Sequence, residues 1–204
     1  MLDKDEETEA ESSATDAAKQ TVSDAAIRCF QQYGPQRTSM ADIADEAGIS
    51  RKTLYRLFDD RPTLIEHILN QRLHEMGVGV KSRLHQFETI EDALVEGSIV
   101  SVAAGRQDRL FSEIVGKDTN HRVEQFMFRG SDTVRENMLK IWSPVLEKGR
   151  KHDVVRDDLT DERIVDLIQN VHALLFIRDD YGENDQRAFL KDFLLPAVLK
   201  VAKQ

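Results

Sequence analysis

Residues 39–58 read SMADIADEAGISRKTLYRLF, and their pattern predicts two short helices joined by a tight turn. Ser39 and Ser50 each precede a helical run, where a serine hydroxyl can accept a hydrogen bond from the free backbone amides of the first turn. Gly48 separates the two runs, and glycine readily adopts the positive φ that a sharp turn between helices often requires. The stretch therefore predicts a helix-turn-helix.

The second helix of this pair is short and basic. Ile43, Ile49, Leu54 and Phe58 fall where a small core is needed, which leaves a polar outer face. That outer face carries Arg51, Lys52, Thr53, Tyr55 and Arg56. A helix of this width fits the major groove of B-form DNA, where Arg and Lys can bind guanine and hydroxyl groups can contact phosphates. Taken alone, the pattern would equally suit a helical hairpin with a solvated basic face.

Upstream of this stretch, apolar residues from Ala18 to Tyr33 recur at the three- and four-residue spacing of one helix face. Gly34 and Pro35 are expected to end that helix. Cys29 lies on the apolar face, and as the single cysteine it cannot form an internal disulfide. We expect it to be a small core residue and not a redox sensor.

The net charge of −9 is unusual for a protein that binds nucleic acid, because Lys and Arg supply most of the affinity for phosphates. The acids are concentrated at one end. Residues 1–16 hold seven acids against Lys4 alone, which leaves a charge of −3 for the rest of the chain. The composition of residues 1–15 predicts a disordered acidic tail, either a solvated extension, which we favour, or a competitor of DNA for the basic face.

Downstream, Pro62 is well placed in the first turn of a further helix, because its missing amide would be unpaired there in any case. Further helical patterns cover residues of about 89–104, 107–116, 121–150, 160–179 and 185–202. No alternating strand pattern occurs. The sequence predicts an all-α fold of about nine helices. The expected parts are the tail (1–15), a helix-turn-helix domain (16–61) and a C-terminal regulatory and dimerisation domain (62–204).

Residues 18–69 resemble the N-terminal signature of the TetR family of transcriptional regulators. The resemblance rests on the run from Thr38 to Phe58, with Phe30 and Gly34 before it and Arg61, Leu64 and Ile65 after it. It implies a three-helix DNA-binding domain, a connecting fourth helix and a helical C-terminal domain that dimerises and often binds a small ligand. Two positions depart from the family pattern: Lys52 replaces a frequent Gly, and Leu57 replaces a frequent His or Tyr.

The resemblance also implies roles for individual residues. Thr38, Tyr55 and Arg61 would contact phosphates, whereas Arg51, Lys52, Thr53 and Arg56 would face bases or nearby phosphates. With the two capping serines, the predicted DNA-binding set is Thr38, Ser39, Ser50, Arg51, Lys52, Thr53, Tyr55, Arg56 and Arg61. The expected partner is a pseudo-palindromic operator in double-stranded DNA, bound by a homodimer that acts as a repressor.

The last two apolar helices could pair with those of a second copy, or they could be buried in the core of a single chain. The resemblance favours the dimer. The predicted interface comprises Ile164, Leu167, Ile168, Val171, Leu175, Phe189, Phe193, Leu194 and Val198. Candidate pocket residues for a small apolar or amphipathic effector are Phe111, Phe126, Met127, Met138, Trp142, His172 and Phe176. Each could instead be ordinary core, although Trp142 and His172 each bring a polar atom.

The sequence leaves two other functions open. The C-terminal domain could respond to a protein partner without any pocket; a fully packed core would favour that reading, and an apolar cavity with a few polar groups would favour ligand sensing. An all-helical enzyme is a remote alternative, because the six histidines are scattered and no metal-binding, phosphate-loop or nucleophile motif occurs. We expect no metal, no cofactor and no catalytic site. No run approaches the roughly 18 apolar residues of a membrane helix, so a cytoplasmic protein is expected.

Overall fold

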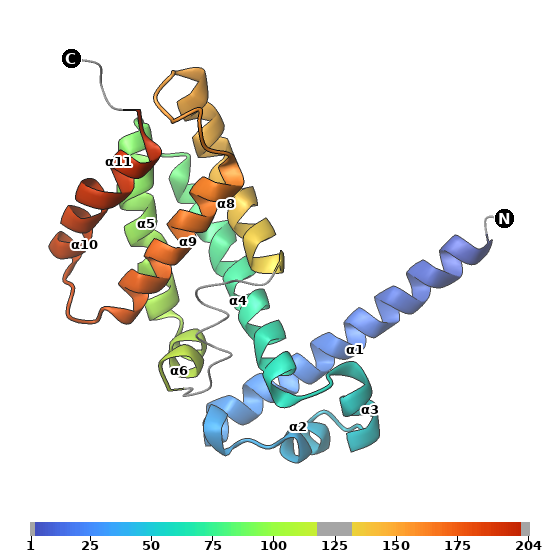
Figure 1. Ribbon diagram of the computed structural model, residues 1–204. Helices are drawn as coiled ribbons and strands as arrows, with labels where there is room; N and C mark the ends of the chain where they lie inside the picture. The colour runs from blue at the N-terminus through green and yellow to red at the C-terminus, as the bar shows by residue number, and fades with distance from the viewer. Residues whose placement is uncertain (1–2, 118–131, 201–204) are drawn as a thin grey trace. The chain divides into compact units, whose positions relative to one another are not determined.

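A computed structural model describes residues 3–117 and 132–200, and every regular element in them is helical (Figure 1). A single antiparallel bridge joins Val155 and Leu199 within these residues. The predicted all-α fold is confirmed. The chain divides into two compact units, Met1–Leu69 (unit 1) and Asn70–Gln204 (unit 2), and the boundary falls inside one helix, Arg61–Leu84.

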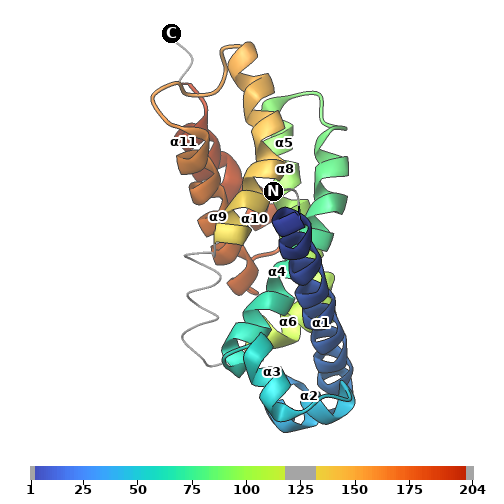
Figure 2. The ribbon, with the colours of Figure 1, turned by 90° about the vertical axis from the view of Figure 1, so that its right-hand side faces the viewer.

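Unit 1 is built around a long first helix. Its elements are α1 (Asp3–Tyr33), the short 3-10 helix η1 (Pro35–Arg37), α2 (Met40–Glu46), α3 (Arg51–Leu57) and the beginning of α4 (Arg61–Leu84). Gly34 and Gly48 make the turns before η1 and α3 with φ of 83° and 66°, values that disfavour a residue with a Cβ. Helices α2 and α3 pack against each other and against α1 (Figure 2).

The core of unit 1 is formed mainly by small and branched residues. Its buried members include Val22, Ala25, Ala26, Cys29, Phe30, Ile43, Ala44, Leu54, Phe58, Leu64, Ile65, Ile68 and Leu69. Cys29 is 4 % exposed, which confirms the expected core position, and burial raises the pKa of its thiol.

The N-terminal residues differ from the sequence-based expectation. Residues 1–15 were predicted to be a disordered tail, yet α1 already begins at Asp3. The scarcity of apolar residues correctly indicates that little can be buried there, but it does not prevent a helix. Glu, Ala and Lys have high helix propensity, and acids near a helix N-terminus interact favourably with the helix dipole. These local preferences account for the extension of α1 without requiring that it pack against another element.

Unit 2 is a helical bundle around α5. Its elements are the rest of α4, α5 (Ile90–Gln107), α6 (Arg109–Lys117), α8 (Asp132–Lys151), α9 (Asp161–Ile177), α10 (Glu183–Phe189), the π-helical turn η2 (Leu190–Leu194) and α11 (Leu195–Val198). Thr89 and Thr160 cap α5 and α9 with their hydroxyls. Trp142, Leu146, Leu94, Ile164 and Ile168 are fully buried at the centre.

The last helix ends earlier than the apolar pattern predicts. Helical structure was expected to residue 202, but α11 ends at Val198 and Leu199 is extended. The amide of Lys200 donates to the carbonyl of Val154 (2.8 Å), and the amide of Arg156 donates to that of Val198 (3.0 Å). These bonds replace helical ones. In the predicted helix 121–150, the structure describes α8 from Asp132 onward, with Pro144 inside it.

Among the described residues, no helix combines the length and the apolar character that crossing a bilayer requires.

Candidate functional site

Two serines fix the starts of the helices in the helix-turn-helix. The Ser50 hydroxyl accepts a hydrogen bond from the amide of Thr53 (3.1 Å) and lies 2.9 Å from the Thr53 hydroxyl. Ser39 and Asp42 form a reciprocal capping box, with the Ser39 amide donating to Asp42 Oδ2 (2.8 Å) and the Asp42 amide donating to Ser39 Oγ (3.2 Å). The Ser39 hydroxyl also donates to Asp42 Oδ2 (2.7 Å), and this bond, followed by the one from the Ser39 amide, lowers the pKa of the Asp42 carboxyl group. Ser39 and Ser50, both predicted to contact DNA, serve as helix caps here.

The outer face of α3 is polar and cationic. Leu54 is fully buried and orients the helix, while Arg51, Lys52, Tyr55 and Arg56 are exposed. Tyr55 is 49 % exposed although it is aromatic. In the part of the chain that the structure describes, Arg51, Lys52 and Arg56 form no salt bridge, although the charge of Arg51 acts on Asp42 from a longer distance, so all three can meet phosphates or bases. Thr53 is half-buried beside the Ser50 cap.

Thr38 and Arg61 stabilise the turn between α1 and α2. Thr38 is 3 % exposed and its hydroxyl donates to the carbonyl of Gly34 (3.0 Å). The Arg61 guanidinium donates to the carbonyl of Pro35 and lies 6.0 Å from the centre of the Phe30 ring. Their predicted phosphate contacts stay predictions, and the structure gives both a role in holding η1. The exposed cation of this turn is Arg37, which sequence reasoning missed because no helical spacing marks it.

Unit 2 contains a partly open cavity of about 110 Å³, lined by residues of α4, α5, α6, α8 and α9. Five of the seven predicted pocket residues line it: Phe111, Met138, Trp142, His172 and Phe176. The other two, Phe126 and Met127, lie outside the described residues. Further lining residues are Leu73, Met76, Gly77, Val80, Ser101, Val102, Gly105, Val134, Asn137, Ile141, Gln169 and Ala173.

Two polar atoms of this cavity are unpaired. Nε2 of Gln169 and Nε2 of His172 are buried and find no hydrogen-bond partner among residues 3–117 and 132–200. Burial lowers the pKa of His172 to about 4, so its ring is neutral at neutral pH. The ring packs against Trp142, with 5.8 Å between ring centres. Sequence reasoning missed Gln169, although its place one helical turn before His172 is the signal that could have found it.

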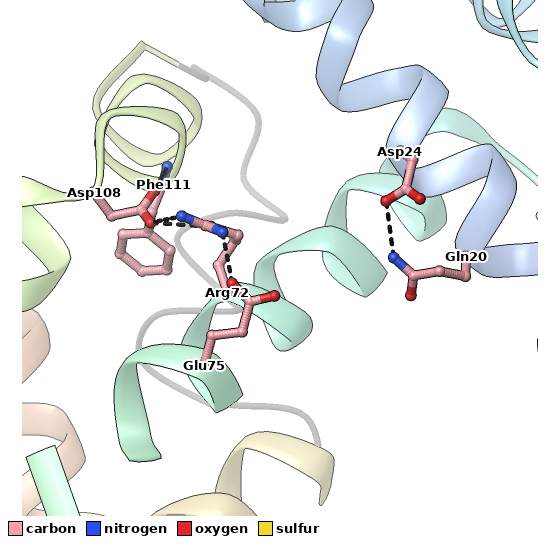
Figure 3. Close-up of polar contacts among 6 residues, drawn as sticks. All are labelled: Gln20, Asp24, Arg72, Glu75, Asp108 and Phe111. Atoms are coloured by element: carbon pink, nitrogen blue, oxygen red, sulfur yellow. Dashed lines mark hydrogen bonds and ion pairs between the residues drawn. The ribbon is translucent and has the colours of Figure 1, made fainter. Parts of the chain in front are cut away.

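A chain of polar contacts joins Phe111 of α6, on one side of the cavity, to Arg72 of α4 (Figure 3). The Phe111 amide donates to Asp108 Oδ1 (2.8 Å), and Asp108 Oδ2 accepts from the Arg72 guanidinium, whose Nε is 3.0 Å away. Arg72 also donates to Glu75 (2.6 Å). The Phe111 ring meets that of Phe176 edge-on, with centres 5.5 Å apart. A ligand that displaces Phe111 would therefore also displace Asp108 and alter its ion pair with Arg72 of α4.

Most residues predicted for a dimer interface are inside the single chain. Ile164, Ile168, Val171, Leu175, Leu194 and Val198 are buried in the core of unit 2, so they have little surface left for a partner. The spacing of apolar residues predicts which face of these helices is buried. It does not predict whether that face packs against the same chain or against a second copy. Leu167 and Phe189 are half-buried, and Phe193 is 63 % exposed. Leu174 and Ile177, which were not predicted, are 37 % and 53 % exposed.

The chain is similar to known bacterial regulatory proteins in both sequence and fold. Residues 22–68 match the family model for bacterial regulatory proteins of the tetR family. An uncharacterized HTH-type transcriptional regulator of Mycobacterium tuberculosis, MT1294, is 40 % identical over 185 residues, covering 90 % of this chain and 87 % of the relative. The HTH-type transcriptional repressor KstR2 of Rhodococcus jostii is 29 % identical over 143 residues, or 68 % of each chain. The crystal structure of the repressor FadR from Thermus thermophilus, in complex with lauroyl-CoA, superposes with a TM-score of 0.65 at 17 % identity, covering 91 % of this chain and 96 % of that chain.

Proposed function

This chain belongs to the TetR family and is a DNA-binding transcriptional regulator, and we propose that it represses its targets as a homodimer on a pseudo-palindromic operator. A small molecule that enters the cavity of unit 2 would release it from DNA. The proposal rests on one observation: the same chain has a solvent-exposed cationic face on α3 in unit 1 and an apolar cavity in unit 2.

The face of α3 supports the DNA-binding part. Arg51 and Lys52 lie in its first turn, where a recognition helix reaches base edges, and Tyr55 and Arg56 follow one turn later. Leu54 anchors the helix to the core, and the Ser50 cap holds its first turn. A helix held rigidly on its inner side can present these side chains without a large ordering cost on binding.

The cavity supports a small-molecule effector over a protein partner. A pocket-free C-terminal domain would fill this space with side chains, whereas about 110 Å³ remains between mostly apolar residues with two unpaired polar atoms. Such a composition is typical of small-ligand sites. A family member of similar fold, FadR of Thermus thermophilus, has been crystallised with lauroyl-CoA.

Release from DNA requires the ligand to bind one conformation better than the other. A ligand that prefers the DNA-incompetent arrangement by about 1.4 kcal/mol lowers operator affinity about tenfold. The route we propose is through Phe111, because this cavity residue is bonded to Asp108, and Asp108 is bonded to Arg72 on α4. Helix α4 is continuous through the boundary between the units.

The dimer would use exposed apolar side chains of the C-terminal helices. Leu174 and Ile177 lie one turn apart on α9, and Phe193 lies in η2 against Phe189, with 4.9 Å between ring centres. Large apolar side chains left exposed on C-terminal helices suit burial against the same groups of a second copy.

The test begins with DNA. The full chain is used to select bound sequences from a random duplex pool, and the recovered site is measured by electrophoretic mobility shift. We expect an inverted repeat and an affinity that falls steeply with salt, because phosphate contacts release counterions. Recovery of no common site, or binding that is independent of salt, would contradict the proposal. Metabolite mixtures are then screened for release of the selected duplex.

A further inference from the structure

Resting on the proposed function, we propose that the cavity of unit 2 selects a small uncharged molecule with an apolar body and one hydroxyl group, which hydrogen-bonds to Gln169 Nε2 and His172 Nε2. The size of the body follows from the space. The cavity measures about 110 Å³, and a cavity of roughly 150 Å³ in another protein takes a benzene ring. A single ring or a short branched chain is therefore the right scale.

The polar part of the ligand follows from the two unpaired atoms. Gln169 and His172 lie one helical turn apart on α9, both line the cavity, and neither Nε2 atom has a partner in the described residues. A buried donor left unpaired is costly, so a ligand that pairs it binds more tightly than one that does not. Residues three positions apart on a helix have Cβ atoms about 5–6 Å apart, so we infer that a single ligand group can bond to both side chains.

A hydroxyl meets the requirements of both atoms. The Gln169 amide nitrogen only donates, so its partner must accept. Nε2 of a neutral histidine donates in one tautomer and accepts in the other. A hydroxyl oxygen accepts from Gln169, and the same group can either accept from His172 or donate to it. A carbonyl would serve one tautomer only.

The residues that line the cavity indicate that the ligand is uncharged. None of the described residues that line the cavity is an Asp, Glu, Lys or Arg. A carboxylate, phosphate or ammonium group placed beside Gln169 and His172 would lose its hydration without gaining an opposite charge, which is strongly unfavourable. The low pKa of His172 is consistent with this, because it keeps the ring uncharged at neutral pH.

Two glycines contribute to the available space. A Cβ on Gly105 would lie 3.3 Å from the Phe176 ring, and a Cβ on Gly77 would lie 2.7 Å from Ile141 Cδ1. Both neighbours line the cavity, so either methyl group would push a wall residue. The glycines thus allow α4 and α5 to approach α8 and α9 without filling the site.

The experiment measures binding of four matched probes to the full chain by calorimetry at neutral pH: phenol, benzene, benzoate and benzylammonium. We expect phenol to bind at least about tenfold more tightly than benzene, and both ions to bind more weakly than phenol. Equal affinities for phenol and benzene, tighter binding of either ion, or no binding of any probe would overturn the proposal.

Two variants assign the preference to its residues. Gln169→Leu and His172→Leu stay close to the original size and remove the polar atom, so each should lower the phenol-to-benzene ratio while benzene still binds. Asn170→Leu makes the same amide-to-alkyl change on the same helix, at a residue that does not line the cavity, and should leave the ratio unchanged. A ratio that stays constant in the first two variants would contradict the assignment even if phenol is preferred.

Failure of this inference is distinguishable from failure of the proposed function. Probe binding is measured without DNA, so a wrong ligand class leaves operator selection intact. Conversely, a chain that binds phenol through Gln169 and His172 but selects no operator would refute the proposed function alone.

Discussion

Arg72 of α4 and Asp108 at the start of α6 form an ion pair in which the carboxylate is almost entirely buried. The Asp108 side chain is 7 % exposed and that of Arg72 is 34 % exposed. The hydrogen bond to Asp108 raises the pKa of Arg72, so the guanidinium is always charged. Asp108 also accepts from the amide of Phe111, which lines the cavity. One carboxylate thus joins the cavity wall to the helix that continues into unit 1.

Weakening this pair should uncouple ligand binding from DNA release. Asp108→Asn keeps an oxygen for the Phe111 amide but loses the charge that Arg72 binds, and should cost about 1–3 kcal/mol of stability. We expect ligand affinity to change little, while most of the coupling free energy between ligand and operator, typically about 1–3 kcal/mol, is lost. Operator affinity measured with and without ligand gives this quantity.

The control for that variant is Glu75→Gln. Glu75 binds the same guanidinium but is 60 % exposed, so its loss should alter the coupling little. Equal coupling in Asp108→Asn and in the unmodified protein would show that the signal does not pass through this pair.

The cationic face of α3 predicts two kinds of DNA-binding defect. Arg51→Ala and Lys52→Ala should each weaken binding to the selected operator by about 1–3 kcal/mol and relax the sequence preference. Tyr55→Ala should lower affinity for all sequences more evenly. Arg83→Ala, which removes an exposed cation in the last turn of α4, is the control. Titrations against operator and scrambled duplexes separate these cases, and an unchanged preference in all variants would exclude α3 as the reader.

The role of Ser50 as a cap can be separated from contact with DNA. Ser50→Ala removes the acceptor for the Thr53 amide and should cost about 0.5–2 kcal/mol of stability. Ser50→Asn and Ser50→Asp should both restore stability, since each supplies an acceptor. If Ser50 contacts DNA as predicted, the aspartate variant should still bind DNA poorly, because its charge would be repelled by the phosphates. Urea unfolding measures the stability of each variant, and electrophoretic mobility shift measures its DNA binding. Full DNA binding by Ser50→Asp would show that Ser50 lies away from the DNA phosphates.

His172 makes stability depend on pH in a defined direction. Its pKa in the folded chain, about 4, lies below the ordinary value of 6.5, so the fold favours the neutral ring. The contribution is fully present above pH 6.5 and is lost as the pH falls toward 4, by about 3 kcal/mol in total. Carboxylates also titrate in this range, so the informative quantity is the difference between the unmodified protein and His172→Gln. If the difference in the free energy of unfolding between the two proteins is the same at pH 7.5 and at pH 4.5, the His172 ring is not held in its neutral form by burial.

The exposed apolar residues predict how the dimer can be broken. Ile177→Asp combined with Phe193→Asp should yield a monomer of about the chain mass, 23.3 kDa, because two carboxylates would have to be buried in the interface. Tyr33→Asp changes a residue of similar exposure in unit 1 and should leave the mass unchanged. Light scattering after size-exclusion chromatography measures this. A dimer that persists in the double variant would place the interface elsewhere.

Local sequence information accounts for the helix-turn-helix. The caps at Ser39 and Ser50 and the positive φ at Gly48 depend on residues within about one helical turn of each other, and the apolar spacing that places Leu54 on the inner face is equally local. Apolar spacing alone predicts helices from about residues 89 and 160, which agrees with the starts of α5 and α9. For residues 1–15 the scarcity of apolar residues is a poor guide to disorder, because helix propensity there is high and α1 begins at Asp3.

Residue patterns alone predict that the chain is helical, which face of each helix is apolar, and where the short cationic helix lies. Tertiary structure decided what each apolar face meets: Ile164 and Ile168 are buried in their own chain, whereas Ile177 and Phe193 are exposed. It also decided that Gln169 and His172 keep unpaired nitrogens at a cavity. The physical reason is that helical spacing specifies the direction of a side chain, while burial and hydrogen-bond pairing depend on elements that are far apart in sequence and adjacent only in the fold.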